Sequence, residues 1–305
     1  AASVRQRLLN RARAEVRDFQ SLLTSYAMER FLRRLSASVY SERFVLKGAL
    51  MLRIWQCPAS RPTVDADFLG HVANDVEAIA RIVREICQTE VEEDGMRYDV
   101  ETLQAERITE DADYGGVRVT FKALLGKARV RMQLDIGFGD IVVPPPETAE
   151  YPTILPGMES PKLRVYSRES AVAEKFEAMV KLGELNSRMK DFYDVWVLAK
   201  HYAFRGPVLA EALTRTFQRR GTPIPAAPIV FSDSFALNEA KRTQWMAFLK
   251  KIRLEAARAP AQSPPQDFQR LIRDVTEFLR PVANACASAQ SFDHHWNPPG
   301  PWKPP

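Results

Sequence analysis

Two aspartates, Asp65 and Asp67, constrain the fold of this chain more than any other feature. The apolar residues Val64, Ala66 and Phe68 alternate with polar ones around them, which predicts a β-strand with both carboxylates on one face. Two like charges side by side destabilise a strand, whereas a divalent cation between them removes the repulsion. Carboxylate oxygens are the ligands that Mg²⁺ and Mn²⁺ prefer. The pair therefore predicts a metal site on a sheet, with a solvated strand edge as the alternative.

The residues before this pair predict a strand, a turn and a helix. Residues 43–47 predict the strand, Gly48 and Ala49 a tight turn, and the apolar residues 50–55 the helix. Lys47 ends the strand, where it would meet a triphosphate or an RNA phosphate, or else have only a surface role. This order of elements, followed by Asp-x-Asp, resembles the DNA polymerase β-like nucleotidyltransferase superfamily. The resemblance implies that the turn gives backbone room to a nucleotide phosphate.

A third aspartate lies in a later predicted strand. Residues 128–136 alternate, with Val130 and Met132 on the apolar face and Asp135 on the polar face. If this strand adjoins the one that carries Asp65, Asp135 completes a cluster of three carboxylates. The alternative is an ordinary aspartate at the end of a strand.

The second half of the chain predicts helices, two of which carry charged residues of interest. Ser167 is the expected N-cap of a helix that ends at Gly183, and Lys175 falls on its apolar stripe. A cation that points inward needs an anionic partner, which a nucleoside triphosphate or the acidic cluster would supply; the alternative is a lysine whose ammonium reaches the surface. Asp191 and Asp194 lie in the first turn of the next helix, where a functional role and a favourable interaction with the helix dipole are both open.

Composition bounds the class of protein. The chain has 305 residues, of which 46% are hydrophobic and 27% charged, as is usual for a globular protein with a large core. Its three cysteines are far apart and lack Cys-x-x-Cys spacing, which argues against a zinc site or disulfide framework and favours the cytoplasm. The first residues run into an amphipathic pattern without an apolar h-region, and no stretch approaches the roughly 18 apolar residues of a membrane span, so we expect neither a secretion signal nor a membrane span. A net charge of +5 is compatible with a nucleic-acid partner.

These patterns predict an α+β protein with a nucleotidyltransferase-like mixed sheet flanked by helices, followed by a mainly helical C-terminal domain. We expect N-terminal helices over residues 1–40 and a catalytic domain over 41–150. A helical domain over 151–290 would complete the active site. A proline-rich tail, residues 291–305, is expected to be disordered or strapped down.

Five stretches taken together resemble the successive motifs of the AbiEii family, the nucleotidyltransferase toxins of bacterial toxin–antitoxin and phage-abortive-infection systems. The stretches are residues 44–49, 61–67, 133–140, 173–179 and 186–194. The resemblance covers roughly residues 25–200, and five motifs in order are far more specific than any one of them.

The resemblance implies a nucleotidyltransferase domain and a helical domain with the active site between them. Family members attach nucleotides from an NTP to RNA, in studied cases to the 3′ acceptor end of tRNA, which blocks aminoacylation and inhibits translation. A cognate antitoxin counters them. The resemblance thus implies an NTP substrate, Mg²⁺ or Mn²⁺ as cofactor, and tRNA or another RNA and the antitoxin as partners, with no membrane.

The resemblance also assigns roles to residues of this sequence. Asp65 and Asp67 would bind metal, with Asp135 in the position of the third carboxylate. Lys175 would hold the triphosphate and Asp191 would complete the site. Thr63 would lie beside the metal pair and belong, with Lys47, Gly48 and Ala49, to the nucleotide-binding set. Arg188 and Lys190 would contact the nucleotide or RNA.

The expected reaction is an in-line attack by an RNA 3′ hydroxyl on the α-phosphate of the NTP, with pyrophosphate leaving. Asp135 would either share a metal ion or help to deprotonate the hydroxyl, and the sequence leaves both open. Two other functions also remain: nucleotide transfer to a protein hydroxyl, and a non-catalytic nucleic-acid or partner-binding module on the same fold. The intact acidic set argues against the second.

Overall fold

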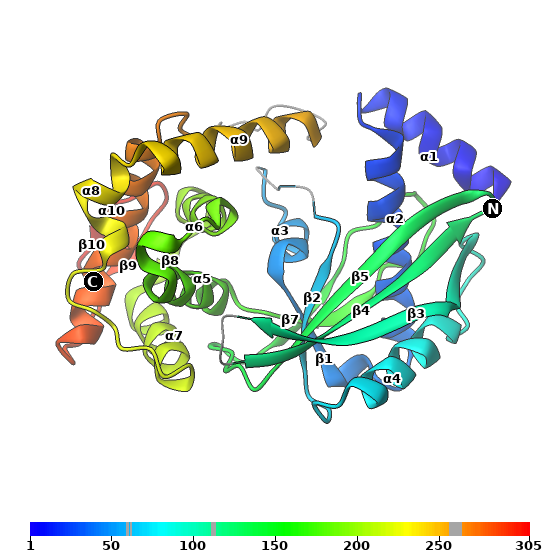
Figure 1. Cartoon of the computed structure of the whole chain (residues 1–305), viewed down its shortest axis with the longest axis horizontal. Coiled ribbons are helices and arrows are strands. Elements are labelled where there is room, and N and C mark those ends of the chain that lie inside the picture. Colours follow the sequence, from blue (N-terminus) through cyan, green and yellow to red (C-terminus); the bar gives the residue numbers. More distant parts are fainter. Residues whose placement is uncertain (59–60, 62, 111–113, 256–263) are drawn as a thin grey trace.

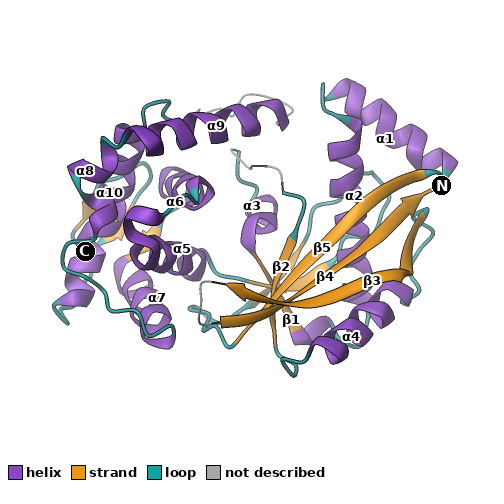
Figure 2. Cartoon of the chain, in the orientation of Figure 1, coloured by secondary structure: helices purple, strands orange, loops and turns teal. Residues whose placement is uncertain are grey.

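The computed structural model describes the whole chain except residues 59–60, 62, 111–113 and 256–263 (Figure 1). A seven-stranded mixed sheet with helices is followed by a mostly helical region (Figure 2), so the predicted α+β class is confirmed. Across the described ranges, no helix has the length and apolar character needed to cross a membrane.

The sheet has the strand order β3–β4–β5–β2–β1–β7–β6. Its strands are β1 (Phe44–Lys47), β2 (Ala66–Gly70), β3 (Met96–Glu110), β4 (Tyr114–Leu125), β5 (Ala128–Phe138), β6 (Glu147–Glu150) and β7 (Lys162–Val165). The central strand β2 pairs antiparallel with β1 and parallel with β5. Strands that are distant in sequence therefore lie on either side of the predicted metal site.

Helices cover one face of this sheet. They are α1 (Ala2–Ala14), α2 (Phe19–Ala37) and α4 (Val76–Gln88). The carboxylates of Asp18 and Asp75 cap α2 and α4 by accepting backbone N–H groups at 2.7 Å. Phe31 of α2 shares a hydrophobic core with Val130 and Met132 of β5. Because side chains alternate along a strand, the polar residues of β5 lie on the opposite face.

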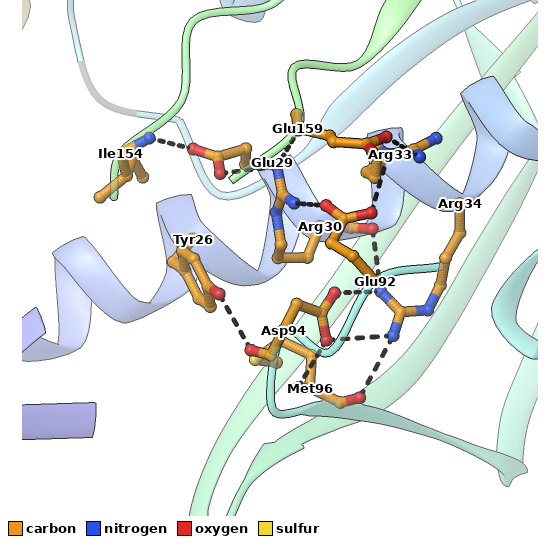
Figure 3. Close-up of polar contacts among 10 residues, drawn as sticks. All are labelled: Tyr26, Glu29, Arg30, Arg33, Arg34, Glu92, Asp94, Met96, Ile154 and Glu159. Carbon is orange, nitrogen blue, oxygen red and sulfur yellow. Dashed lines mark hydrogen bonds and ion pairs between the residues drawn. The ribbon is translucent and has the colours of Figure 1, made fainter. Parts of the chain in front are cut away.

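Buried charges tie α2 to the loops around it (Figure 3). Arg34 pairs with Asp94 at 2.5 Å, and Arg30 pairs with Glu29 at 3.0 Å and with Glu92 at 2.7 Å. Backbone groups complete these contacts: Arg30 donates to the Glu159 carbonyl at 2.8 Å, Arg34 to that of Met96 at 3.3 Å, and Glu29 accepts the Ile154 N–H at 2.5 Å. We call Glu29, Arg30, Arg34, Glu92 and Asp94 the α2 cluster.

The second half of the chain packs as a helical unit. Its helices are α5 (Arg168–Leu182), α6 (Met189–His201), α7 (Gly206–Arg219), α8 (Asp233–Ala236), α9 (Glu239–Glu255) and α10 (Phe268–Ala287). The short α3 (Met51–Ile54) and the 3₁₀ turns η1 (Ser41–Arg43), η2 (Gly48–Leu50), η3 (Gly183–Leu185) and η4 (Ile229–Phe231) complete the helical elements. Ser167 caps α5 as predicted, since its hydroxyl accepts the Ser170 N–H at 3.1 Å.

The proline-rich tail is ordered and packed against the helical unit, which is one of the two states expected from the sequence. The strands β8 (Phe204–Arg205), β9 (His295–Trp296) and β10 (Trp302–Lys303) form a small antiparallel sheet. The indole of Trp296 is buried and donates to the Ala199 carbonyl at 2.7 Å. Trp302 donates to the Phe278 carbonyl at 2.8 Å. The tail thereby packs against the end of α6 and against α10.

Two hydrophobic clusters form the core. The first lies within residues 4–166, so the N-terminal helices share it with the sheet. The second is built of residues 172–296 together with Leu52, Cys57 and Val143. The predicted domain boundaries at residues 40, 150 and 290 remain a prediction.

Candidate active site

Three carboxylates meet on the uncovered face of the sheet. The parallel register of β2 and β5 places Asp67 opposite Asp135, and Asp65 lies immediately before β2. One carboxylate oxygen from each residue lies within 4.8 Å of the other two. Asp135 is buried and the other two are half-buried. The structure therefore brings together the three aspartates that the sequence singles out; we call them the acidic triad.

The strand around the triad begins later than predicted. β2 starts at Ala66, and Val64, the expected first apolar position, is 68% exposed. Asp65 is instead fixed by a side-chain contact, since the hydroxyl of Thr63 donates to its carboxylate. Thr63 therefore lies beside the metal pair, where the family resemblance places it, and its observed contact is with Asp65.

Gly48 is required by the position of Asp67. Lys47 and Asp67 are partners in the β1–β2 register, and the chain turns at Gly48 with a φ of +71°. A Cβ atom at this position would lie 1.9 Å from Oδ2 of Asp67. Both the left-handed backbone and the close carboxylate exclude a side chain at Gly48. Ala49 follows in the η2 turn and is buried.

Arg118 of β4 holds the third carboxylate. Its guanidinium donates to both oxygens of Asp135 at 2.8 Å, and the Gln133 amide adds a contact at 3.2 Å. The hydrogen bond to Asp135 raises the pKa of Arg118. Sequence reasoning missed Arg118 because the contact depends on the β4–β5 register, which pairs Arg118 with Asp135.

A second charged group lies between the first half of the chain and helices α5 and α6. The ammonium of Lys175 lies 3.1 Å from Asp191 and 2.9 Å from Asp194. Arg61, from the segment before β2, donates to both oxygens of Asp194 at 2.8 and 2.9 Å. We call Arg61, Lys175, Asp191 and Asp194 the α5–α6 cluster. Lys175 is inward-facing as predicted, and two aspartates supply its anionic partner.

Electrostatics keep this cluster ionised. Burial alone would lower the pKa of Lys175, but the carboxylates of Asp194 and Asp191 outweigh it and raise that pKa. Burial would raise the pKa of Asp194, yet Arg61 and Lys175 lower it to about 2. Lys175 and Asp194 are therefore both charged at neutral pH.

Lys47 enters a neighbouring network. Its ammonium lies 2.9 Å from Asp140 and 3.5 Å from Glu174, and its side chain is 9% exposed. Arg220 of the segment after α7 also binds Asp140, at 3.1 Å. Burial would raise the pKa of Asp140, but Lys47 and Arg220 lower it. Asp140 and Glu174 had no predicted role, since nothing local in the sequence indicates partners so far away.

These two networks border a small pocket. Its volume is about 40 Å³, and its lining includes Gly48, Tyr166, Glu174, Lys175 and Asp194. The turn before the acidic triad and the cations of α5 and β1 therefore open onto one space.

A family profile described as the nucleotidyl transferase AbiEii toxin of a type IV toxin–antitoxin system matches residues 30–274. The chain belongs to the AbiEii family. Membership makes it a nucleotidyltransferase toxin of a type IV system, with a nucleotide as substrate and an antitoxin as partner.

Two solved structures resemble this AbiEii chain, both from Helicobacter pylori. One is described as a candidate nucleotidyltransferase; it is 16% identical, has a TM-score of 0.45, and the match covers 88% of this chain and 96% of that one. The other, JHP933, is 16% identical with a TM-score of 0.44, and the match covers 88% and 93%. No curated protein matches the chain.

The acidic triad of this AbiEii toxin could bind a metal ion. Its three ligand residues offer hard carboxylate oxygens within 4.8 Å of one another. This donor set suits Mg²⁺ or Mn²⁺. Each oxygen of Asp135 accepts one hydrogen bond from Arg118 and keeps a second lone pair that a cation could use. The residues present therefore fit the metal.

Two predicted contact residues lie at the start of α6. The N–H of Arg188 donates to the Asn186 side chain at 2.8 Å, and its own side chain is half-buried. Lys190 is exposed. They flank Met189 one turn before Asp194, on the same helix end as Asp191.

Proposed function

We propose that this AbiEii toxin transfers a nucleotide from an NTP to the 3′ acceptor end of tRNA, which inhibits translation. The observation that carries the proposal is the acidic triad, one carboxylate oxygen from each of Asp65, Asp67 and Asp135 within 4.8 Å, in a chain of a nucleotidyltransferase family. An NTP and tRNA as substrates place the reaction in the cytoplasm, where the cognate antitoxin counters it.

Mg²⁺ or Mn²⁺ would be held by Asp65, Asp67 and Asp135. When bound, a divalent metal polarises the α-phosphate and stabilises the attacking and leaving oxygens. In the transfer, the RNA 3′ oxygen bonds to the α-phosphorus, the bond to the β-phosphate breaks, and the hydroxyl loses its proton to a base.

The side chains of the protein supply the rest of the site. Thr63 and Arg118 hold Asp65 and Asp135, so that the triad is arranged before substrate arrives. Lys175 and Arg61 offer positive charge that the triphosphate and the departing pyrophosphate would use. Gly48 lets the carboxylate of Asp67 lie directly against the backbone of the turn, which lines the pocket together with Lys175.

Labelling tests the proposal. Purified protein is incubated with total tRNA, Mg²⁺ and each α-labelled NTP in turn, beside Asp65→Ala and the matched control Asp293→Ala, whose aspartate is exposed in the tail. We expect label on tRNA with the wild type and the control, and loss with Asp65→Ala. The label should also disappear with EDTA and with tRNA whose 3′ diol has been cleaved by periodate.

The opposite results are equally clear. Label on protein would replace RNA with a protein acceptor, and label that survives periodate would exclude the 3′ end. No label with any NTP would leave a non-catalytic binding module on this fold.

A further inference from the structure

A row of cations continues from the acidic triad along the uncovered face of the sheet. Along β5, the side chains of Arg129, Arg131, Gln133 and Asp135 share the face opposite the α2-covered core. Successive members are about 7 Å apart along the strand. Figure 1 shows β4 and β5 running from β2 toward α1. The row therefore starts at the predicted catalytic centre and leads away from it.

The two arginines of this row have no acidic neighbour opposite them on β4. The register places Lys122 of β4 directly opposite Arg131, and Leu124 opposite Arg129. All three cations are exposed, and their side chains make no hydrogen bond or ion pair within the part of the chain that the structure describes. Like charges directly across a sheet are destabilising, so the fold gains nothing from this pair. A bound polyanion would remove the repulsion.

Acidic residues limit the row on one side. On the edge strand β3, Asp99 lies opposite Lys122 and Glu106 opposite Arg118. Negative charge therefore borders the cations on the β3 side and directs a polyanion along β5.

The surface also favours nucleic acid over protein. No residue of the row or of its β4 partners is among the large apolar side chains exposed in the described residues, although Val64 lies beside Asp65 at the start of the row. The core of a protein interface is apolar and aromatic. Cations with Gln133 and Thr120 between them instead offer hydrogen-bond donors to phosphate and sugar oxygens.

We propose that Lys122, Arg129 and Arg131 form a track that binds the backbone of the acceptor RNA and delivers its 3′ end to the acidic triad. This inference rests on the proposed transfer to RNA and adds the surface that the RNA occupies. The track contributes affinity for RNA without sequence preference, because it contacts phosphates. The chemistry of the transfer stays with the triad and the α5–α6 cluster.

A matched pair of variants tests the track. Arg129→Gln with Arg131→Gln removes two charges from it, while Arg81→Gln with Arg84→Gln removes two exposed charges from α4 on the covered side of the sheet. Binding is measured without NTP, from the anisotropy of a fluorescent RNA with a single-stranded 3′ end, across a range of KCl concentrations. We expect the track variant to bind about tenfold more weakly, with a salt slope smaller by about 1 to 2, and the α4 variant to match the wild type.

Steady-state kinetics give a second readout. The track variant should raise KM for RNA about tenfold and leave KM for NTP and kcat at saturating RNA unchanged. Equal weakening by both double variants, a change in KM for NTP alone, or loss of antitoxin binding with RNA binding intact would overturn the track. A wild type that binds this RNA but transfers nothing to it would refute the proposed function and leave the track standing. A wild type that does not bind RNA would overturn the track.

Discussion

The α2 cluster and the α5–α6 cluster bury similar charges in different surroundings. In the α2 cluster, backbone groups of residues 96, 154 and 159 form hydrogen bonds with the same side chains that make the ion pairs. In the α5–α6 cluster, Arg61 and Lys175 form hydrogen bonds and ion pairs with the side chains of Asp191 and Asp194, and no backbone carbonyl of the described residues takes part. The α5–α6 cluster also borders a pocket, whereas the α2 cluster joins one helix to its loops. Similar ion pairs thus join a helix to its loops in one place and, in our proposal, hold cations ready for a substrate in the other.

Removing a charge from the α2 cluster should have the largest effect, and it should fall on stability. Arg34→Met leaves Asp94, whose side chain is 2% exposed, without its guanidinium. We expect the free energy of unfolding to fall by about 3–5 kcal/mol, because an uncompensated charge is left buried. Denaturant unfolding measures this. Loss of transfer activity in the fraction that remains folded would break the distinction between the clusters.

Lys175→Met should affect activity instead. We expect kcat for nucleotide transfer to fall about 10²- to 10³-fold, because a cation aimed at the triphosphate is lost. Stability should change less than with Arg34→Met, since Asp194 keeps both hydrogen bonds to Arg61. Activity and unfolding are measured on one preparation. A stability loss equal to that of Arg34→Met would contradict the functional interpretation.

The α5–α6 cluster should also show in the pH dependence of stability. Arg61 and Lys175 lower the pKa of Asp194 to about 2 from its usual 3.8. This stabilises the fold by about 2 kcal/mol above about pH 5, and the stabilisation is lost as pH falls toward 2. Urea unfolding of wild type and Asp194→Asn should therefore differ most at neutral pH and converge in acid. A pH-independent difference would refute the assignment.

Removing a charge from an exposed ion pair should change stability least. Arg215 and Glu211 on α7 are 51% and 55% exposed. Glu211→Gln should change the free energy of unfolding by less than about 0.5 kcal/mol, because water screens the pair. A larger change by thermal or denaturant unfolding would show that burial is not what separates the clusters from the surface.

Sequence reasoning found the residues that alternate or repeat. The period-two pattern of residues 128–136 predicted that Asp135 lies on the polar face of its strand. The apolar stripe that includes Lys175 predicted that this side chain points inward. The α+β class followed from the same patterns. Periodicity fixes the face on which a side chain lies.

It does not fix which strands are neighbours or where a strand starts. Arg118 binds Asp135 only through the β4–β5 register, and Gly48 meets Asp67 only through the β1–β2 pairing. Val64 is exposed because the strand begins after it. Lys47, predicted to contact a phosphate, pairs with Asp140 and Glu174, partners that are 93 and 127 residues away. Its nucleotide contact stays a prediction, as do those of Arg188 and Lys190.

The strapped tail has a consequence for the timing of synthesis. The indole of Trp296 donates a hydrogen bond to Ala199 of the site helix α6, and the two residues are 97 positions apart in the sequence. At roughly 5 to 20 residues per second, the ribosome needs roughly 5 to 20 s to travel that distance. Until then, α6 lacks the indole that covers its end, and the second core is incomplete. We expect the nascent toxin to stay inactive until Trp296 has been made, because the helix that carries Asp191 is secured by a residue 97 positions beyond Ala199.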